Sequence, residues 1–336
     1  MIEKRHIFNA TVVNDAEFEA YKTRGFITEE GHFFEKLFYK FAFILFIAFF
    51  GSCLYLFYKY RKSYIIRQRG FTLTFIGGIV TFLNTFFSFF PQMMKVPCAL
   101  SAYNANILNV LVNMIFFCRS LRVFLSYRYN IFKVSAIKNR KLLNHKLDSK
   151  KPMSEPSSYL KKVMKRINYV LAAVIIIPAL ISTIATIIIH IKMKDHCSFT
   201  ERGDAMLSLK KNEGRPLFIV VQIFGGLYTF LSFVMSILLT FVKDANAFGI
   251  KFECISTCIL IFIANVINVI LQINASIDYD VNTNNHRRMY LDLFESTKGG
   301  KMLFTVVSLY MLFASITLPL LHYYKSRKNN RKFNEA

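Results

Sequence analysis

The sequence contains no tryptophan, and its 20 acidic residues are outnumbered by 43 lysines and arginines. Without tryptophan, the 17 tyrosines are the side chains left to anchor helices at a membrane surface. Polar residues are scarce as well, since 54% of the 336 residues are hydrophobic, whereas globular domains have about 45–50%. This composition excludes a water-soluble fold, and it excludes disorder outside tails and loops.

The net charge of +23 would suggest a nucleic-acid partner in a soluble protein. Here, however, the basic residues lie between long apolar runs rather than along one amphipathic surface. This distribution is typical of membrane proteins, in which lysine and arginine fix the orientation of the helices. We therefore predict a lipid bilayer as the environment and no nucleic-acid partner.

An apolar stretch of about 18 or more residues can cross a bilayer as a helix, because all its backbone hydrogen bonds are satisfied internally. The stretches that qualify are Phe41–Tyr58, Phe71–Phe90, Ala99–Cys118, Asn168–Ile191, Leu217–Phe241, Phe252–Ile273 and Met302–Tyr324. The predicted fold class is an all-α membrane protein, a bundle of seven transmembrane helices.

The basic residues also predict the orientation. If the N-terminus lies outside the cell, 26 basic and 5 acidic residues fall on the cytoplasmic side, against 17 basic and 15 acidic residues outside. Because lysines and arginines near helix ends are retained inside, this split predicts an outward N-terminus and an inward C-terminus. The first 35 residues lack the apolar core of a signal peptide, so the first helix must itself insert. We expect an extracellular segment over residues 1–36, the bundle over 37–324 and a short basic tail over 325–336, in the plasma membrane.

The connections between the predicted helices are unequal in length. The second cytoplasmic loop, about residues 120–166, contains the stretch KKPMSEPSS, so we expect a mobile segment over Asn130–Lys165. On the outer side, His196–Arg215 and Asp278–Lys301 are long enough to cover the bundle. An odd number of helices without an inverted repeat is unlike the usual transporter architectures.

Catalytic and metal-binding motifs are absent from the sequence. The seven histidines are scattered, no aspartate lies in the middle of a span, and Ser52 beside Cys53 has no buried base to activate it. We therefore expect no enzymatic activity, no cofactor and no metal. His190, Glu253 and His322 lie at span ends, where extension of the side chain toward the headgroups is the simplest interpretation.

The polar residues inside the spans are mainly carboxamides. Two groups share helical spacing, Asn106, Asn109 and Asn113 in the third span and Asn265, Asn268 and Gln272 in the sixth. Each group must face away from lipid, either to hydrogen-bond between helices or to line a ligand pocket. In the second case Asn106 and Gln272 would lie nearest the outer opening.

Cysteines and sequons agree with this topology. Of the six cysteines, Cys98 and Cys197 lie on the predicted outer side, where oxidising conditions permit a disulfide that would fix the outer loop to the third helix. The alternative is two free thiols. Both sequons, at Asn9 and Asn274, also lie outside, and Asn9 is the better glycosylation site because Asn274 is close to a helix end.

Four runs carry a family resemblance: IRQRGFTLTFIGG, VPC, CRSLRVFLSYRYN and KDANAFGIKFE. Together they resemble the seven-helix region of fungal and plant receptors that carry a regulator of G-protein signalling domain, and more distantly the class C receptors. The resemblance covers roughly Arg61 to Pro319. It implies Cys98 as one half of the disulfide, an inner end of the third helix at Arg119, Arg122 and Arg128, and a turn into the sixth helix formed by Asp244, Gly249, Ile250, Lys251 and Glu253.

The chain also departs from that family. It ends shortly after the seventh helix, so we expect no regulator domain, and its N-terminal segment is too short for a flytrap ligand domain. The rhodopsin-type signatures are missing too, since the seventh helix has Leu318-Pro319-Leu320 in place of Asn-Pro-x-x-Tyr.

We therefore expect a G-protein-coupled-receptor-like protein that senses an extracellular small molecule and signals to a heterotrimeric G protein. The expected cytoplasmic coupling surface comprises Arg119, Arg122, Arg128, Lys243, Asp244, Lys251 and Glu253. Two alternatives stay open: a channel or facilitative transporter with an asparagine-lined pore, and a truncated paralogue that dimerises with longer receptors. The signalling receptor and the truncated paralogue are both compatible with a homodimer or a heterodimer.

Overall fold

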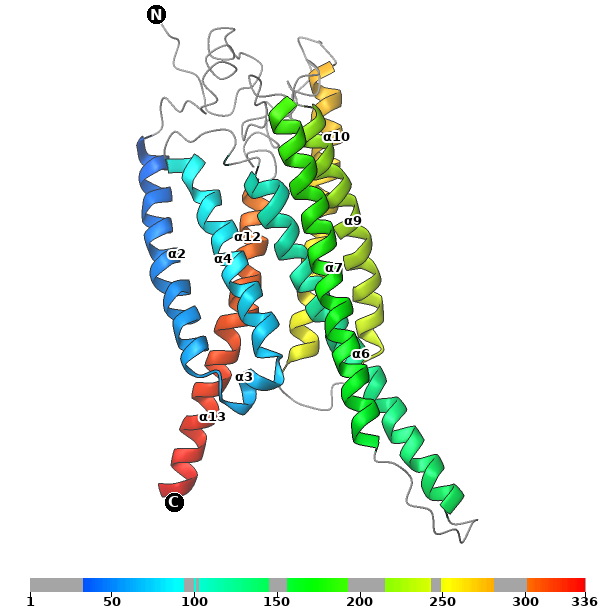
Figure 1. Ribbon diagram of the computed structural model, residues 1–336. Helices are drawn as coiled ribbons and strands as arrows, with labels where there is room; N and C mark the ends of the chain where they lie inside the picture. Colours follow the sequence, from blue (N-terminus) through cyan, green and yellow to red (C-terminus); the bar gives the residue numbers. More distant parts are fainter. Residues whose placement is uncertain are drawn as a thin grey trace, which may run out of the picture.

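The computed structural model describes residues 33–93, 100, 103–144, 156–192, 215–242, 249–280 and 301–335. Within these ranges the regular elements are all helices, and seven of them are long and apolar enough to cross a membrane (Figure 1). This confirms the predicted all-α bundle of seven spans. The chain is an integral, multi-pass membrane protein by this criterion.

The first six spans are single helices, apart from a short π-helical segment, η2, that opens the third. They are α2 (Phe33–Lys59), α4 (Phe71–Met93), η2 (Asn104–Leu108) with α6 (Asn109–Asn144), α7 (Pro156–Lys192), α9 (Arg215–Thr240) and α10 (Ile250–Asp280). The seventh span is α12 (Lys301–Leu312), the π-helical η3 (Phe313–Thr317) and α13 (Leu318–Glu335) in succession. A short helix, α3 (Tyr64–Gln68), lies between the first two spans.

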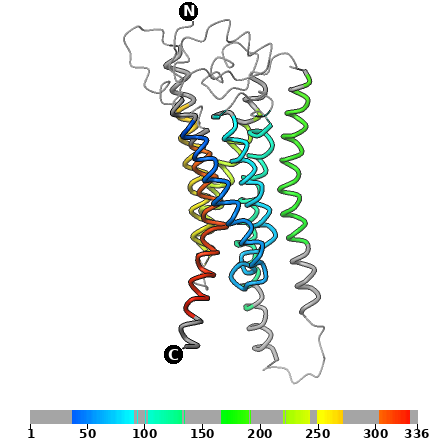
Figure 2. The backbone as a smooth tube through the Cα atoms, turned by 90° about the vertical axis from the view of Figure 1, so that its left-hand side faces the viewer, coloured from blue at the N-terminus to red at the C-terminus, as the bar shows by residue number. Residues whose placement is uncertain are grey.

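The helix α6 lies at the centre of the bundle. It contacts α4, α7, α9 and α10, and half of its apolar span is buried inside the protein. The main core cluster surrounds Val110 and Met114 of this helix with Phe224 and Tyr228 of α9 and Met311 of α12. The helix α7 is the opposite case, since only 17% of its apolar span is buried and it stands at the side of the bundle (Figure 2).

From Ile176 onward, the exposed side chains described in α7 are all isoleucine or leucine, including Ile177, Ile181, Ile184 and Ile188. In a soluble protein such a face would need a partner, but acyl chains cover it in a bilayer. The same holds for the outward faces of α2, α9 and α10, which expose many large apolar residues. The lipid environment therefore accounts for a surface that water would not tolerate.

One end of the bundle is marked by the short helix α3 and by the exit of α13. We call the end at which α3 lies, and at which α13 leaves the bundle, the α3 end (Figure 1). The helices α6 and α7 also extend past the bundle at this end. On the predicted orientation the α3 end faces the cytoplasm.

The segment expected to be a mobile loop over Asn130–Lys165 is helical in part. Helix α6 continues to Asn144, and α7 begins at Pro156. The physical reason is local, since residues 130–144 contain neither glycine nor proline and include good helix formers such as lysine, leucine and arginine. Proline at the first position of α7 is favourable because its missing N–H would have no helical partner there.

Two of the helix-helix contacts depend on glycine. A Cβ placed on Gly77 would lie 2.9 Å from a methyl carbon of Ile115, and one on Gly78 would lie 2.8 Å from a terminal carbon of Ile316. Helix α4 therefore packs closely against α6 on one side and η3 on the other. The absence of a side chain at these two glycines therefore allows the close packing.

Candidate functional site: a buried charge triad at the α3 end

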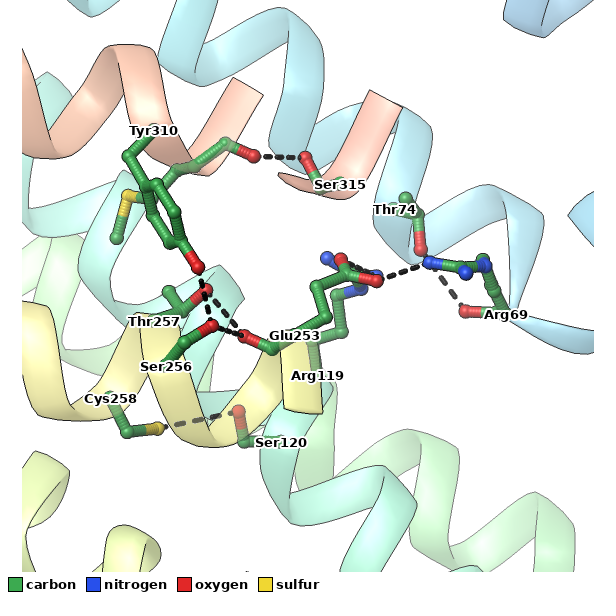
Figure 3. Close-up of polar contacts among 11 residues, drawn as sticks. Arg69, Thr74, Arg119, Ser120, Glu253, Ser256, Thr257, Cys258, Tyr310 and Ser315 are labelled. Atoms are coloured by element: carbon green, nitrogen blue, oxygen red, sulfur yellow. Dashed lines mark hydrogen bonds and ion pairs between the residues drawn. The ribbon is translucent and has the colours of Figure 1, made fainter. Parts of the chain in front are cut away.

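Three charged side chains from separate parts of the chain meet inside the bundle at the α3 end (Figure 3). Glu253, in the first turn of α10, accepts a hydrogen bond at Oε2 from Nη1 of Arg69, and its Oε1 forms an ion pair with Nη2 of Arg119 in α6. The side chains of Arg69, Glu253 and Arg119 are only 0%, 1% and 5% exposed. We call Arg69, Arg119 and Glu253 the charge triad.

Glycines in the left-handed conformation shape the backbone on both sides of the charge triad. Gly70, at φ 72°, follows Arg69 and leads directly into α4, and Gly249, at φ 69°, precedes α10. The N–H of Glu253 donates to the carbonyl of Gly249 at 2.9 Å, which forms the first helical bond of α10. Thr74 donates from its hydroxyl to the carbonyl of Arg69 at 3.1 Å. Residues other than glycine seldom adopt this conformation, so both turns depend on the glycine at that position.

The charge triad carries one net positive charge in a nearly dry position. Isolated buried charges are very unfavourable, and pairing offsets that penalty without reversing it by much. Glu253 is therefore required by both arginines, because it supplies the negative charge that each of them faces. Among the side chains that the structure describes, Glu253 is the only carboxylate.

Hydrogen bonds extend from Glu253 to the seventh span. Tyr310 of α12 donates from its hydroxyl to Oγ of Ser256 at 2.6 Å, and Ser256 donates to the carbonyl of Glu253 at 3.1 Å. Thr257 donates to the same carbonyl at 2.7 Å. The backbone of α10 at the charge triad is thus connected to α12 by a short chain of hydroxyls (Figure 3).

A second contact joins α10 to α6 next to the charge triad. The thiol of Cys258 donates to Oγ of Ser120 at 3.5 Å, and Ser120 is the neighbour of Arg119. Both side chains are buried. An ion pair and a weak hydrogen bond therefore join the start of α10 to α6 around Arg119 and Ser120.

The predicted coupling residues fall into three groups. Arg119 and Glu253 are buried partners, so the expected extension of Glu253 toward the headgroups is wrong. Arg122 is half-buried and Arg128 is exposed, with its guanidinium over the ring of Phe124. Lys251 donates from Nζ to the carbonyl of Thr240 at 3.1 Å.

Several predicted residues lie where the structure makes no statement. Lys243, Asp244, Cys98, Cys197 and Asn9 fall outside the described residues, and the side chains of His190 and Gln272 do too. The disulfide and the glycosylation site therefore stay predictions. The four cysteines that are described, Cys53, Cys118, Cys254 and Cys258, are buried free thiols.

The carboxamides of the third span do not act as one group. Asn113 donates from Nδ2 to the carbonyl of Asn109 at 2.8 Å and to its side-chain oxygen at 3.0 Å, within one helix. Asn106 is only 1% exposed, and neither polar atom of its side chain has a hydrogen-bond partner among the described residues. Its backbone carbonyl accepts a hydrogen bond from Ser182 of α7.

The carboxamides of the sixth span also differ from one another. Asn265 donates to the carbonyl of Ile261 at 2.8 Å, and its side-chain oxygen would lie 3.6 Å from a Cβ on Gly225 of α9. Asn265 therefore packs in the contact between α10 and α9. Asn268 has a buried side-chain oxygen with no hydrogen-bond partner in the described part of the chain.

Sequence reasoning missed Arg69 and Tyr310 as members of this site. Arg69 lies in the run IRQRGFTLTFIGG, next to the glycine that turns the chain into α4, and that position is its only local signal. Tyr310 has none, because a tyrosine inside an apolar span is common at helix contacts.

The chain was compared with models of protein families, with curated proteins and with solved structures, and none of them matches it. The family named above is therefore a resemblance of four sequence runs. The function that follows from the charge triad is a proposal.

Proposed function

We propose that this chain is a receptor in the plasma membrane that senses an extracellular small molecule and signals to a heterotrimeric G protein at the α3 end. The charge triad is the observation that carries the proposal. It joins α10 to α6 and to the connection between α2 and α4, so three parts of the fold meet in it. A separation of α10 from α6 at the α3 end therefore breaks the charge triad.

The energetics of buried ion pairs suit a switch. Such a pair adds little net stability over apolar packing, because desolvation offsets most of the Coulombic attraction. When α10 moves away from α6, water and headgroups can solvate all three charges, so the open state recovers much of what the closed state loses. Two packings of similar free energy are what a ligand needs in order to shift a population.

The movement proposed is a separation of α10 from α6 at the α3 end. A helical segment of a G protein needs a cleft there, and Arg119 and Arg122 of α6 would line its wall together with Lys251 of α10. These residues belong to the coupling surface predicted from the sequence. In the closed packing Arg119 is occupied by Glu253, so signalling and pairing exclude each other.

Ligand binding is proposed near the opposite end, around Asn106. Its carboxamide is buried without a hydrogen-bond partner among the described residues and lies in the π-helical segment η2. Short π-helical segments within α-helices are frequent at functional sites. A polar ligand group that bonded Asn106 would satisfy a side chain that the closed bundle leaves unsatisfied.

The test is nucleotide exchange on the G-protein α subunits of the host organism, in membranes that contain this chain. We expect Glu253→Gln to raise exchange without ligand several-fold, because the closed packing loses its shared carboxylate. The control is Glu35→Gln, which makes the same chemical change near the start of α2, at the end of the bundle opposite the charge triad. It should leave nucleotide exchange unchanged.

Two results would contradict the proposal. Absence of exchange with every α subunit, for the wild type and for Glu253→Gln, would remove the receptor function. An ion current through bilayers that contain only the purified chain would favour the channel instead, in which the asparagines line a pore. Asn113 and Asn265 offer little to a pore, since both donate to their own helix.

A further inference from the structure

A cluster of tyrosines joins the first and seventh spans at the α3 end. The ring of Tyr60, just after α2, lies 4.7 Å from that of Tyr323 and 5.8 Å from that of Tyr324, both in α13. The hydroxyls of Tyr60 and Tyr324 are 3.5 Å apart. We call Tyr60, Tyr323 and Tyr324 the tyrosine cluster.

Basic residues flank the tyrosine cluster in the sequence. The exposed cations that flank it in the two chain segments are Lys59, Arg61, Lys62, Lys325, Arg327 and Lys328. The guanidinium carbon of Arg61 lies 4.3 Å from the centroid of the Tyr58 ring, which packs next to the cluster against Phe71 and Phe75 of α4. The rings thus bring together two basic segments that are about 260 residues apart in the chain and hold them at one corner of the bundle.

No carboxylate neutralises this corner from within its own segments. The sequence has no acidic residue between Glu35 and Asp148, and none between Glu295 and Glu335. Glu253, the one described carboxylate, has an arginine at each oxygen. Orientation in the membrane needs only a sufficient number of cations near helix ends, and it does not require them to converge on an aromatic cluster.

We propose that the tyrosine cluster and its cations bind the headgroup of a polyphosphorylated inositol lipid in the leaflet at the α3 end. The first candidate span ends at Lys59, and the apolar stretch of the seventh ends at Tyr324. The basic residues that follow both ends place the cluster at headgroup level. Arginine forks and lysine ammonium groups match phosphate oxygens, and tyrosine suits the boundary between acyl chains and water. Groups of 4–8 cations next to a transmembrane helix are typical of such lipid sites. The proposal is independent of G-protein coupling, because it needs only a membrane-spanning bundle whose α3 end faces the cytoplasm, as the basic residues predict.

The experiment uses the full chain purified in detergent and a fluorescent dioctanoyl phosphatidylinositol bisphosphate, followed by anisotropy. We expect saturable binding that unlabelled bisphosphate displaces and dioctanoyl phosphatidylserine at equal total charge does not. Arg61→Gln combined with Arg327→Gln should weaken binding by about tenfold or more, since each cation near a membrane surface contributes about fivefold.

The matched control is Arg128→Gln combined with Arg166→Gln. Both of these arginines are exposed, and Arg128 also lies over an aromatic ring, that of Phe124. The control removes the same charge from α6 and α7, so we expect less than about a threefold change. Arg61→Lys combined with Arg327→Lys should keep most of the affinity.

Misfolding is separated from loss of the site by a second pair, Lys62→Gln with Lys328→Gln, which lie on the exposed surface and should also weaken binding. Three results would overturn the proposal. Equal losses in the test and control pairs would mean diffuse attraction. Equal displacement by phosphatidylserine would remove the preference for several phosphates. Equally tight binding of free inositol trisphosphate would make a soluble anion, rather than a lipid, the occupant.

Discussion

The backbone of Gly70 lies against the guanidinium of Arg122, so closely that a Cβ placed on Gly70 would be 2.7 Å from Nη1 of Arg122. Gly70 follows Arg69 of the charge triad, and Arg122 lies about one helical turn beyond Arg119 in α6. The connection between α2 and α4 is therefore fitted to α6 at two neighbouring points. One is an ion pair through Glu253, and the other is direct contact.

Gly70→Ala should destabilise the protein by about 1–2 kcal/mol, because alanine is strained at positive φ. Displacement of Arg122 adds to this loss. The measurement is the thermal unfolding midpoint in detergent. Gly226→Ala is the control, since Gly226 is in a helix with nothing within 4 Å of an added Cβ, and alanine is the better helix former there. Equal midpoints for Gly70→Ala and the wild type would show that the contact has no energetic weight.

Removal of the negative charge alone should lower the stability of the protein more than replacement of all three charged residues. Glu253→Gln removes the negative charge that the buried Arg69 and Arg119 share and should lower stability by about 3–5 kcal/mol. Replacing Arg69, Arg119 and Glu253 together by methionine should recover most of that loss, because no charge then remains buried. The thermal midpoints of the two variants test this. If the triple variant is the less stable of the two, the charge triad is a stabilising feature and not a switch.

The seven spans could be predicted from the sequence because apolar length is a local property. Each predicted stretch matches a helix, but most of the helices continue past the end of the apolar stretch, with α9 as an exception at Thr240. The third span was expected to end at Cys118, whereas α6 continues to Asn144. Hydropathy marks the boundary of the hydrocarbon region, and helix propensity then decides where the helix stops.

The charge triad could be predicted only in part. Arg119 and Glu253 were assigned to one end of the bundle, yet their pairing depends on which faces of α6 and α10 meet. The sequence predicts how deep Glu253 lies in the membrane but not which way its side chain points. Extension toward the headgroups is therefore the simpler prediction from the sequence alone. The asparagine groups show the same limit, since shared spacing did not reveal that Asn113 bonds to Asn109 while Asn106 does not.

The bond between Tyr310 and Ser256 should couple the seventh span to the charge triad. Tyr310→Phe removes the donor and should reduce stability by about 0.5–1.5 kcal/mol. Ser256→Ala removes the acceptor, and the double variant should be no less stable than the less stable single variant, because the two changes abolish one shared bond. Unfolding midpoints of the four proteins complete the cycle. Fully additive losses would mean that the two hydroxyls act separately.

The orientation of the bundle is open to a direct test. An epitope after Glu335 should be accessible to antibody only after the cells are permeabilised, because the tail is predicted to lie inside. An epitope before Asn9 should be accessible on intact cells. Labelling of the tail from outside would place the charge triad at the extracellular end, and the receptor proposal would then fail.

Asn106 and Asn113 allow a pocket residue to be distinguished from a packing residue without any known ligand. Both polar atoms of Asn106 are buried with no partner among the described residues, a state that costs about 1–3 kcal/mol. Asn106→Leu has a similar shape and no such penalty, so it should raise the thermal midpoint. Asn113→Leu should lower the thermal midpoint slightly, because the side chain at position 113 loses its bonds to Asn109.

A polar side chain that is kept at the expense of stability is typical of binding sites, where its hydrogen-bond partner arrives with the ligand. If Asn106→Leu instead destabilises the protein by more than about 1 kcal/mol, the carboxamide serves helix packing and the ligand site lies elsewhere.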